Sequence, residues 1–174
     1  VADTGNHAVR RVDLASGSLS TLAGTLGSGG LSGDGGPAAT ALLHFPYSVV
    51  FDALAEQLYV VEPYNHAVRL LDLASGTLST LAGVLGSPGA GGDGGPATAA
   101  QLHFPYGVAL DLVARQLYVA DAGNHAVRLV DLELATMKTV VGILGSEGGR
   151  AGAGGPAAAA RLHYPSGVAV DPDP

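Results

Sequence analysis

The sequence predicts an all-β chain made of three four-stranded β-propeller blades, and three observations lead to that prediction. A ten-residue segment, VADTGNHAVR at 1–10, returns as VVEPYNHAVR at 60–69 and as VADAGNHAVR at 119–128. Each copy is part of a repeat with four short segments of strand-like alternation, separated by turn residues. The chain has 27 Gly and 10 Pro in 174 residues, which favours tight turns over long helices. Four antiparallel strands per repeat are typical of a propeller blade.

Two strands and a turn make up the repeated ten-residue segment. The strand before the turn reads QLYVVE and QLYVAD in the later copies, and such residues suit a pleated, half-buried surface. The turn, DTGN at 3–6, is tight, and we expect Gly5 to supply its unusual backbone dihedrals. These two strands are predicted at 1–3 and 7–13, at 57–62 and 66–72, and at 116–121 and 125–131.

A hairpin and a long connection complete the repeat. Gly17 stands where a positive φ is easily adopted, and the third copy loses this glycine. Residues 25–47 begin with glycines that exclude regular structure, and then Pro37 opens a predicted helix of one to two turns. The third strand is predicted at 18–24, 77–83 and 136–142, and the fourth at 48–52, 107–111 and 167–171.

Composition disfavours several classes of partner. The net charge is −7, and one lysine and seven arginines form no basic run. Nucleic-acid binding and attachment to an acidic membrane surface both need clustered Lys and Arg. No apolar run reaches the roughly 18 residues of a membrane span. The absence of cysteine excludes a disulfide framework and a zinc–thiolate site, and it leaves the compartment unassigned.

The repeated residues resemble the NHL-repeat family of β-propellers, which is named for Asn-His-Leu. This chain has Asn-His-Ala at 6–8, 65–67 and 124–126, within a wider LYVADxGNHxVRxVD pattern followed by Thr-Leu-Ala-Gly. The segment GDGGPATAAQLHFP at 92–105 resembles a long-loop subgroup of such repeats. The resemblance covers nearly the whole chain and implies a propeller that typically has six blades. The family includes protein-binding scaffolds, RNA-binding modules and a few enzymes such as the amidating lyase, so the fold assigns no single activity.

Three blades are expected to form half of a ring. We predict one NHL-type segment over 1–174, with repeats at about 1–56, 57–115 and 116–174 that each start at the second strand of a blade. Propellers generally close with about four to eight blades, and an open set leaves bare strand edges. We therefore expect a second propeller half, either another chain in a homodimer or the remainder of a longer chain. Because Val1 lies inside a repeat and the sequence does not begin with methionine, we expect a fragment, a processed product, a trimmed chain or the visible part of a longer chain.

The histidines and the residues around them recur in every copy. Equivalent histidines lie one blade apart, far beyond the zinc–nitrogen distance of about 2.0–2.1 Å, so we predict that they pack or bond to turns. The arginines recur together with an acidic residue, which favours charge-assisted hydrogen bonds within or between blades over ligand binding. The repeated structural polar set is Asn6, His7, Arg10, Asn65, His66, Arg69, Asn124, His125 and Arg128. The second group of histidines is His44, His103 and His163.

The glycine-rich segments GDGG at 33–36 and 92–95 have two interpretations. Such a loop can present backbone N–H groups to an anion, or its aspartate could contact calcium. However, the Gly-Lys-Ser/Thr of a phosphate loop is absent, and so is a row of carboxylates. Asp34 and Asp93 are replaced by Ala153 in the third copy. We favour a turn that leads into the segment opened by proline.

The sequence favours a non-enzymatic protein-interaction or structural scaffold module. Nearly every polar residue is copied between blades, whereas an active site needs different residues that converge, so we assign no catalytic, cofactor-binding or metal-binding residue. The alternative is part of a propeller enzyme of the lyase or hydrolase type with a metal in the central channel. An RNA-binding module is less favoured because of the acidic charge. The proposed contacts for a partner protein are Tyr47, Tyr64 and Tyr106, which could instead pack the connection onto the next blade.

Overall fold

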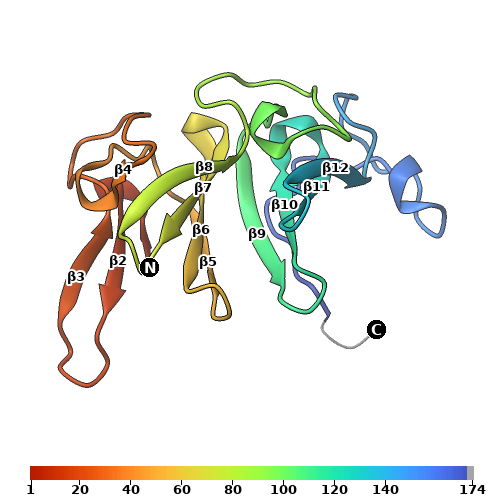
Figure 1. Cartoon of the computed structure of the whole chain (residues 1–174). Helices are drawn as coiled ribbons and strands as arrows, with labels where there is room; N and C mark the ends of the chain where they lie inside the picture. The colour runs from red at the N-terminus through yellow and green to blue at the C-terminus, as the bar shows by residue number, and fades with distance from the viewer. Residues whose placement is uncertain (172–174) are drawn as a thin grey trace.

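The computed structural model describes residues 1–171 as three antiparallel sheets that lie side by side (Figure 1). Each sheet is one blade: blade 1 contains β1 to β3, blade 2 contains β4 to β8, and blade 3 contains β9 to β12. The described residues contain no α-helix, only short 3-10 turns. The prediction of an all-β propeller fold is thereby confirmed. No helix in this part of the chain is long and apolar enough to cross a membrane.

The strands and turns follow the repeat. Most of the predicted strands form within one or two residues of their expected bounds. The strands are β1 (Ala2–Asp3), β2 (Ala8–Val12), β3 (Leu19–Ala23), β4 (Gly36–Pro37), β5 (Ser48–Asp52), β6 (Gln57–Glu62), β7 (Ala67–Asp72), β8 (Thr77–Ala82), β9 (Pro105–Asp111), β10 (Gln116–Asp121), β11 (Ala126–Asp131) and β12 (Thr136–Val141). The 3-10 turns are η1 (Thr4–Asn6), η2 (Ala38–Thr40), η3 (Pro63–Asn65), η4 (Ala97–Ala99), η5 (Ala122–Asn124) and η6 (Ala157–Ala159).

The connection that leaves one blade covers the edge of the next. We call these connections connector 1 (residues 25–47), connector 2 (84–104) and connector 3 (143–166). The strand order of blade 2 is β4-β8-β7-β6-β5, so the two residues of β4, which belong to connector 1, extend the sheet beyond its fourth strand. Gly36 pairs there with Leu78. Blades 2 and 3 are therefore each completed at the outer edge by the connector that precedes them.

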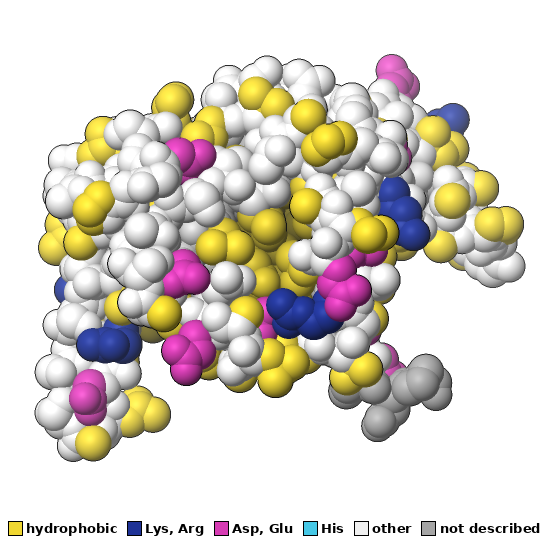
Figure 2. Space-filling view, in the orientation of Figure 1, with side chains coloured by type: hydrophobic (Ala, Val, Ile, Leu, Met, Phe, Trp, Pro, Cys, Tyr) yellow, Lys and Arg dark blue, Asp and Glu magenta, His cyan; other side chains and the backbone are white. Residues whose placement is uncertain are grey.

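The hydrophobic core lies between neighbouring blades, and the connectors fill it. One cluster joins blade 1, connector 1 and blade 2, and a second joins blade 2, connector 2 and blade 3. Burying each such leucine or valine stabilises the fold by about 1.5–3 kcal/mol. Figure 2 shows hydrophobic side chains on the floor of a central hollow of the molecule. The buried residues of the first cluster are Val9, Ala23, Ala38, Ala41, Leu43, Val60, Leu71 and Leu78.

The turn at residues 3–6 differs from the prediction in one respect. Gly5 does not take a positive φ, and the left-handed residue is the histidine that follows the turn. His7, His66 and His125 have φ values of 56°, 54° and 56°. A left-handed non-glycine residue costs about 1–2 kcal/mol, which other interactions of the fold must offset. The prediction for Gly17 is confirmed, because its φ is 70°, and in the third copy Ala135 takes a φ of 53° without a glycine.

Two predicted elements form differently. The helix expected after Pro37 is a single 3-10 turn, because Ala41 and Leu43 both face the core, and a spacing of two residues requires extended backbone. The strand predicted at 167–171 is not formed. This segment passes beside β9, where a Cβ on Gly107 would meet the backbone of Ser166 and Gly167. No strand among the described residues pairs with it, so it lacks a hydrogen-bonded ladder.

Candidate functional site

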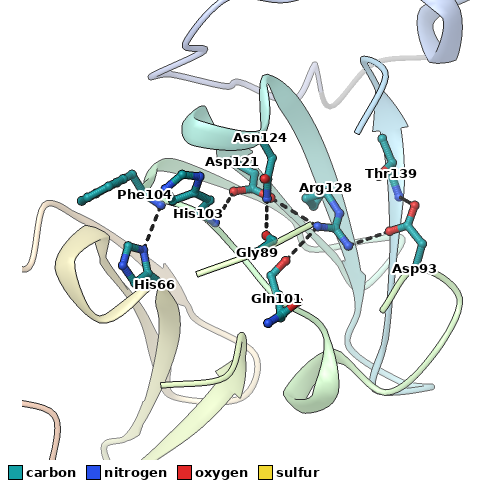
Figure 3. A network of polar contacts seen from close by, with 10 residues as sticks. All are labelled: His66, Gly89, Asp93, Gln101, His103, Phe104, Asp121, Asn124, Arg128 and Thr139. Atoms are coloured by element: carbon teal, nitrogen blue, oxygen red, sulfur yellow. Dashed lines mark hydrogen bonds and ion pairs between the residues drawn. The ribbon is translucent and has the colours of Figure 1, made fainter. Parts of the chain in front are cut away.

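A buried arginine is the centre of a polar network in blade 3 (Figure 3). Arg128 lies on β11, and its Nη1 donates to Asp121 Oδ2 at 3.2 Å and to the carbonyl oxygen of Gln101 at 3.1 Å. Its Nη2 donates to Asp93 Oδ1 at 2.6 Å. Asp93 belongs to connector 2 and also accepts the backbone N–H of Thr139 on β12 at 3.0 Å. One guanidinium therefore joins two strands to the preceding connector.

The buried carboxylate of this network, Asp121, accepts three hydrogen bonds, one of them from Arg128. Asp121 accepts the backbone N–H of His103 at 2.7 Å and the Nδ2 of Asn124 at 2.7 Å. Asn124 also donates to the carbonyl oxygen of Gly89 in connector 2 at 2.6 Å (Figure 3). Burial raises the pKa of Asp121, and the hydrogen bonds and the positive charge of Arg128 oppose that rise. The asparagine of the repeated motif thus attaches the turn to the connector.

Blade 2 contains the same network. Arg69 donates from Nη1 to Glu62 Oε2 at 2.9 Å, and its Nη2 pairs with Asp34 of connector 1. Asp34 also accepts the hydroxyl of Thr80 at 2.6 Å. Asn65 donates to the carbonyl oxygen of Gly30 at 2.7 Å. Burial raises the pKa of Glu62, although the charge of Arg69 and the neighbouring hydrogen bonds act to lower it.

The first copy of the network is open. Arg10 pairs with Asp3 at 3.1 Å, and Asn6 donates to the same carboxylate at 3.0 Å. Among the residues that the structure describes, no second carboxylate pairs with Arg10, and no connector carbonyl accepts from Asn6. Asn6 is exposed, whereas its equivalents Asn65 and Asn124 are buried.

The left-handed histidines hold the connectors through their rings. The Nδ1 atoms of His7, His66 and His125 accept the backbone N–H groups of Phe45, Phe104 and Tyr164, each at 3.1 Å. In each case the imidazole ring of one blade therefore accepts from the last residues of the connector that follows it.

The second group of histidines packs against the first. His44, His103 and His163 lie 5.4–5.7 Å, between ring centroids, from the first group. Burial and the nearby His103 lower the pKa of His66. Within residues 1–171, no group of three or more His, Asp or Glu side chains is placed to hold a metal ion.

Aromatic side chains lie where connectors 1 and 2 enter blades 2 and 3, at the end of the strands that is followed by the turns η1, η3 and η5. We call Phe45, Tyr47, Tyr64, Phe104 and Tyr106 the aromatic seam. The ring of Tyr64 lies 5.0 Å from that of Phe45 and 5.6 Å from that of Phe104, and Tyr47 lies 5.0 Å from Tyr106. Tyr47 and Tyr64 are 54% and 52% exposed, and Tyr106 is half-buried. Of the three tyrosines singled out in the sequence, Tyr47 and Tyr106 are therefore in contact, and Tyr64 packs in a separate group with Phe45 and Phe104.

Tyr64 distinguishes the second blade from the others. Glycine occupies its place in the other two turns, as Gly5 and Gly123. A Cβ on Gly123 would lie 2.7 Å from atoms of His103, so blade 3 has no room for a side chain there without rearrangement. In blade 2 the same place projects an exposed ring between two connectors.

Two contacts escaped the sequence reasoning. The first is the partnership of Asp34 and Asp93 with the arginines, which a constant separation of 35 residues to Arg69 and Arg128 could have indicated. The second joins blades 2 and 3 at the other end of the strands. There Arg115 of blade 3, which stands where blade 2 has Glu56, donates to Asp52 Oδ2 at 2.7 Å.

Asp52 is fully buried and also accepts the hydroxyl of Tyr59 at 3.1 Å. Burial alone would raise the pKa of Asp52, but the hydrogen bonds from Arg115, Tyr59 and two backbone N–H groups outweigh it and lower the pKa. Burial and the Asp52 charge raise the pKa of Tyr59 to about 12. This end of the blade interface is therefore held by an ionised carboxylate.

Comparison with known sequences finds relatives that carry NHL repeats. NHL repeat-containing protein 2 of Homo sapiens is 31% identical over 159 residues, which cover 84% of this chain and 20% of that protein. The protein of the same name from Bos taurus is 31% identical over 144 residues, with 79% and 19% covered. Protein SUPPRESSOR OF QUENCHING 1, chloroplastic, of Arabidopsis thaliana is 29% identical, with 82% and 13% covered. The chain thus spans about a fifth or less of the length of these relatives.

Solved structures share the fold. A protein of unknown function from Bacteroides thetaiotaomicron superposes with a TM-score of 0.72 at 17% identity, covering 96% of this chain and 38% of that one. An auxiliary nutrient binding protein from Bacteroides ovatus superposes with a TM-score of 0.69 at 18% identity, covering 97% and 39%. No family model matches the chain. The relatives, the propeller-type neighbours and the repeated Asn-His motif together show that the three repeats belong to the NHL-repeat family.

Proposed function

We propose that the chain is a non-enzymatic scaffold module whose aromatic seam binds a partner protein. The observation that carries the proposal is Tyr64, an exposed ring in a place where the other copies have glycine. Repetition of the fold does not require this ring, so a binding role accounts for it better than a structural one. At a coarser level, the NHL-repeat relatives and a neighbour named as a nutrient binding protein support a binding or scaffold role.

The chemistry of the seam suits a protein contact. Tyrosine offers a large apolar ring with a polar tip, and it is enriched among the residues that dominate binding energy. Tyr64 is supported by the rings of Phe45 and Phe104, which come from two different connectors. A ring held on both sides loses little conformational freedom when it binds, which favours affinity.

The test compares the wild-type chain with Tyr64→Gly, which gives blade 2 the residue that the other two turns carry. Peptides are selected by display on the immobilised wild-type chain and then titrated against both forms. We expect peptides whose affinity falls at least about tenfold on Tyr64→Gly, as for the loss of an interface hot spot. Val113→Ser, in an exposed turn at the opposite end of the strands, is the matched control and should leave affinity unchanged. Selection of peptides that bind Tyr64→Gly equally well would contradict the proposal.

We further propose that the three blades close into a ring against a second propeller half. The exposed edge of β3 supports this proposal, and so does the segment 167–170, which forms no strand where the repeat predicts one. Light scattering over a range of concentrations tests whether a second copy of the chain is that half. A dimer supports closure by a second copy, and a folded monomer at every concentration contradicts it.

A further inference from the structure

The same apolar positions are buried in blades 2 and 3 and exposed in blade 1. Leu78 on β8 and Met137 on β12 are almost fully buried, whereas the equivalent Leu19 on β3 is 55% exposed. Leu71 is buried under connector 1, and its equivalent Val12 is 44% exposed. Figure 2 shows hydrophobic side chains on the surface of the hairpin between β2 and β3, at the lower left. The structure therefore shows what covers this face in the other blades, namely a preceding connector.

The backbone edge of blade 1 is open in the same places. Gly35 N–H donates to the carbonyl oxygen of Leu78 at 2.7 Å, and Gly94 N–H donates to that of Met137 at 2.7 Å. Met137 N–H in turn donates to the carbonyl oxygen of Gly95 at 3.0 Å. In blade 1 the equivalent N–H and carbonyl groups are those of Leu19. They lie at the edge of the sheet, which ends at β3. A bare edge of this kind is a template for pairing with another strand.

The arginine of this face also has fewer carboxylate partners than its equivalents. Arg69 and Arg128 each have one carboxylate from their own blade and one from a connector. Arg10 has Asp3 from its own blade, and its second carboxylate is missing among the described residues. A face with exposed leucine and valine, an open strand edge and a half-paired arginine matches a connector that carries aspartate.

Connector 3 has the residues that would cover such a face, but it lacks the aspartate. Its Ala157 and Leu162 stand where connectors 1 and 2 place buried residues, and neither is buried. Gly152, Gly154 and Pro156 keep the glycine-proline pattern, but Ala153 stands in place of Asp34 and Asp93. A second copy of this chain could cover Leu19 with connector 3, yet it would leave Arg10 without its second carboxylate.

We infer that blade 1 docks a connector from a different NHL-type repeat, one that carries aspartate at the position of Asp34, in preference to connector 3 of a second copy. The inference rests on the proposed ring closure and names its partner. The docked connector adds a short strand to β3, covers Leu19 and Val12, and places its aspartate on Arg10. The aspartate is the feature that selects this partner, because a charge-assisted hydrogen bond is formed only with it.

A peptide with the sequence of residues 84–105 serves as the aspartate-bearing connector. It is titrated against the 174-residue chain, alongside the same peptide with Asp93→Ala. The chain's own connectors already occupy blades 2 and 3 at high effective concentration, so the free peptide finds blade 1 as its open site. We expect the wild-type peptide to bind roughly ten- to a hundredfold more tightly than the Asp93→Ala peptide, as a charge-assisted hydrogen bond contributes.

The variant Arg10→Met completes a double-mutant cycle with the Asp93→Ala peptide, and it tests whether Arg10 is the residue that contacts the aspartate. Arg10 is on the open face, so its replacement is expected to leave the fold intact, which circular dichroism verifies. On Arg10→Met the two peptides should bind with affinities that differ by no more than about twofold, within the additivity expected of uncoupled sites. Equal affinities on the wild-type chain, a difference that persists on Arg10→Met, or no binding at millimolar peptide would each overturn the inference.

A second measurement uses the chain itself. Ala153→Asp gives connector 3 the missing carboxylate, so self-association measured by sedimentation should strengthen by roughly tenfold or more. The double variant Ala153→Asp with Arg10→Met should return to the wild-type value. If the wild-type chain already dimerises tightly and Ala153→Asp does not strengthen the dimer, connector 3 of a second copy is the partner. The aspartate then does not determine which connector binds blade 1, and the inference is overturned.

Discussion

Blade 1 and blade 2 carry the same motif residues and differ in what covers them. In blade 2 the arginine, the asparagine and the strand edge all find partners in connector 1, and the apolar face is buried beneath it. In blade 1 the same residues are present, and their connector partners are missing among the described residues. The comparison teaches that a sequence repeat is not a structural unit. The unit is a blade together with the connector that precedes it.

The difference also explains why the motif keeps its polar residues. An arginine at the core of a sheet is stable only when its charge is paired and hydrogen-bonded. The two carboxylates of Arg69 come from different parts of the chain, one from β6 and one from connector 1. The network therefore fixes the register of the connector on the blade, which an apolar contact alone would leave free to slide.

Replacing the arginines is expected to have the largest effect on the free energy of unfolding. Arg69→Met leaves the fully buried Glu62 without its charge partner and should lower the free energy of unfolding by about 3–5 kcal/mol. Arg10→Met removes a partly exposed pair and should cost no more than about 1 kcal/mol. Urea unfolding followed by circular dichroism measures both. Equal losses in the two variants would show that the connector contributes nothing to the arginine network.

The asparagines provide a second comparison of the same kind. Asn65→Ala removes a buried side chain and leaves the partly buried carbonyl oxygen of Gly30 without its donor, which should cost about 1–3 kcal/mol. Asn6→Ala removes only an exposed contact to Asp3 and should change stability by about 0.5 kcal/mol or less. The same urea titrations give both values. A loss in Asn6→Ala as large as that in Asn65→Ala would contradict this account.

The contact at the other end of the strands should be weaker. Arg115→Gln removes the cation from Asp52, which keeps its hydrogen bonds from Tyr59 and the backbone, so we expect a loss of about 1–2 kcal/mol after allowance for the partial exposure of Arg115. Glu56→Gln, at the equivalent exposed position of blade 2, is the control and should have no effect. Ultraviolet titration adds a second readout: Arg115 opposes the rise that burial and Asp52 cause in the pKa of Tyr59, so Arg115→Gln should raise that pKa further.

The smallest expected effect is on pH dependence. The folded-state pKa of His66 lies below its ordinary value of 6.5, so the unfolded chain takes up a proton first as the pH falls. The contribution of His66 is fully present above about pH 6.5 and is lost as the pH falls towards the folded-state pKa. Unfolding measured at pH 7.5 and at lower pH should show this loss, and His66→Asn should reduce it. An unchanged pH profile in His66→Asn would assign the loss to other groups.

The local features of the fold could be predicted from the sequence, and the long-range partnerships could not. Alternation and turn residues predict most of the strands, and Gly17 predicts its hairpin turn, because these depend on neighbours in the chain. The left-handed histidines could not be predicted, since their conformation depends on a ring contact to Phe45 or its equivalents, 38 or 39 residues away. The pairing of Asp34 with Arg69 spans 35 residues and becomes visible only when the connector is seated.

Amide hydrogen exchange at Leu19 and Met137 tests the central claim most directly. Met137 N–H is bonded to connector 2 and should exchange slowly, whereas Leu19 N–H lies on the open edge of β3 and should exchange quickly. Addition of the aspartate-bearing connector peptide should slow exchange at Leu19 and leave Met137 unchanged. Slow exchange at both positions in the monomeric chain alone would contradict the claim that a blade is completed by the connector that precedes it.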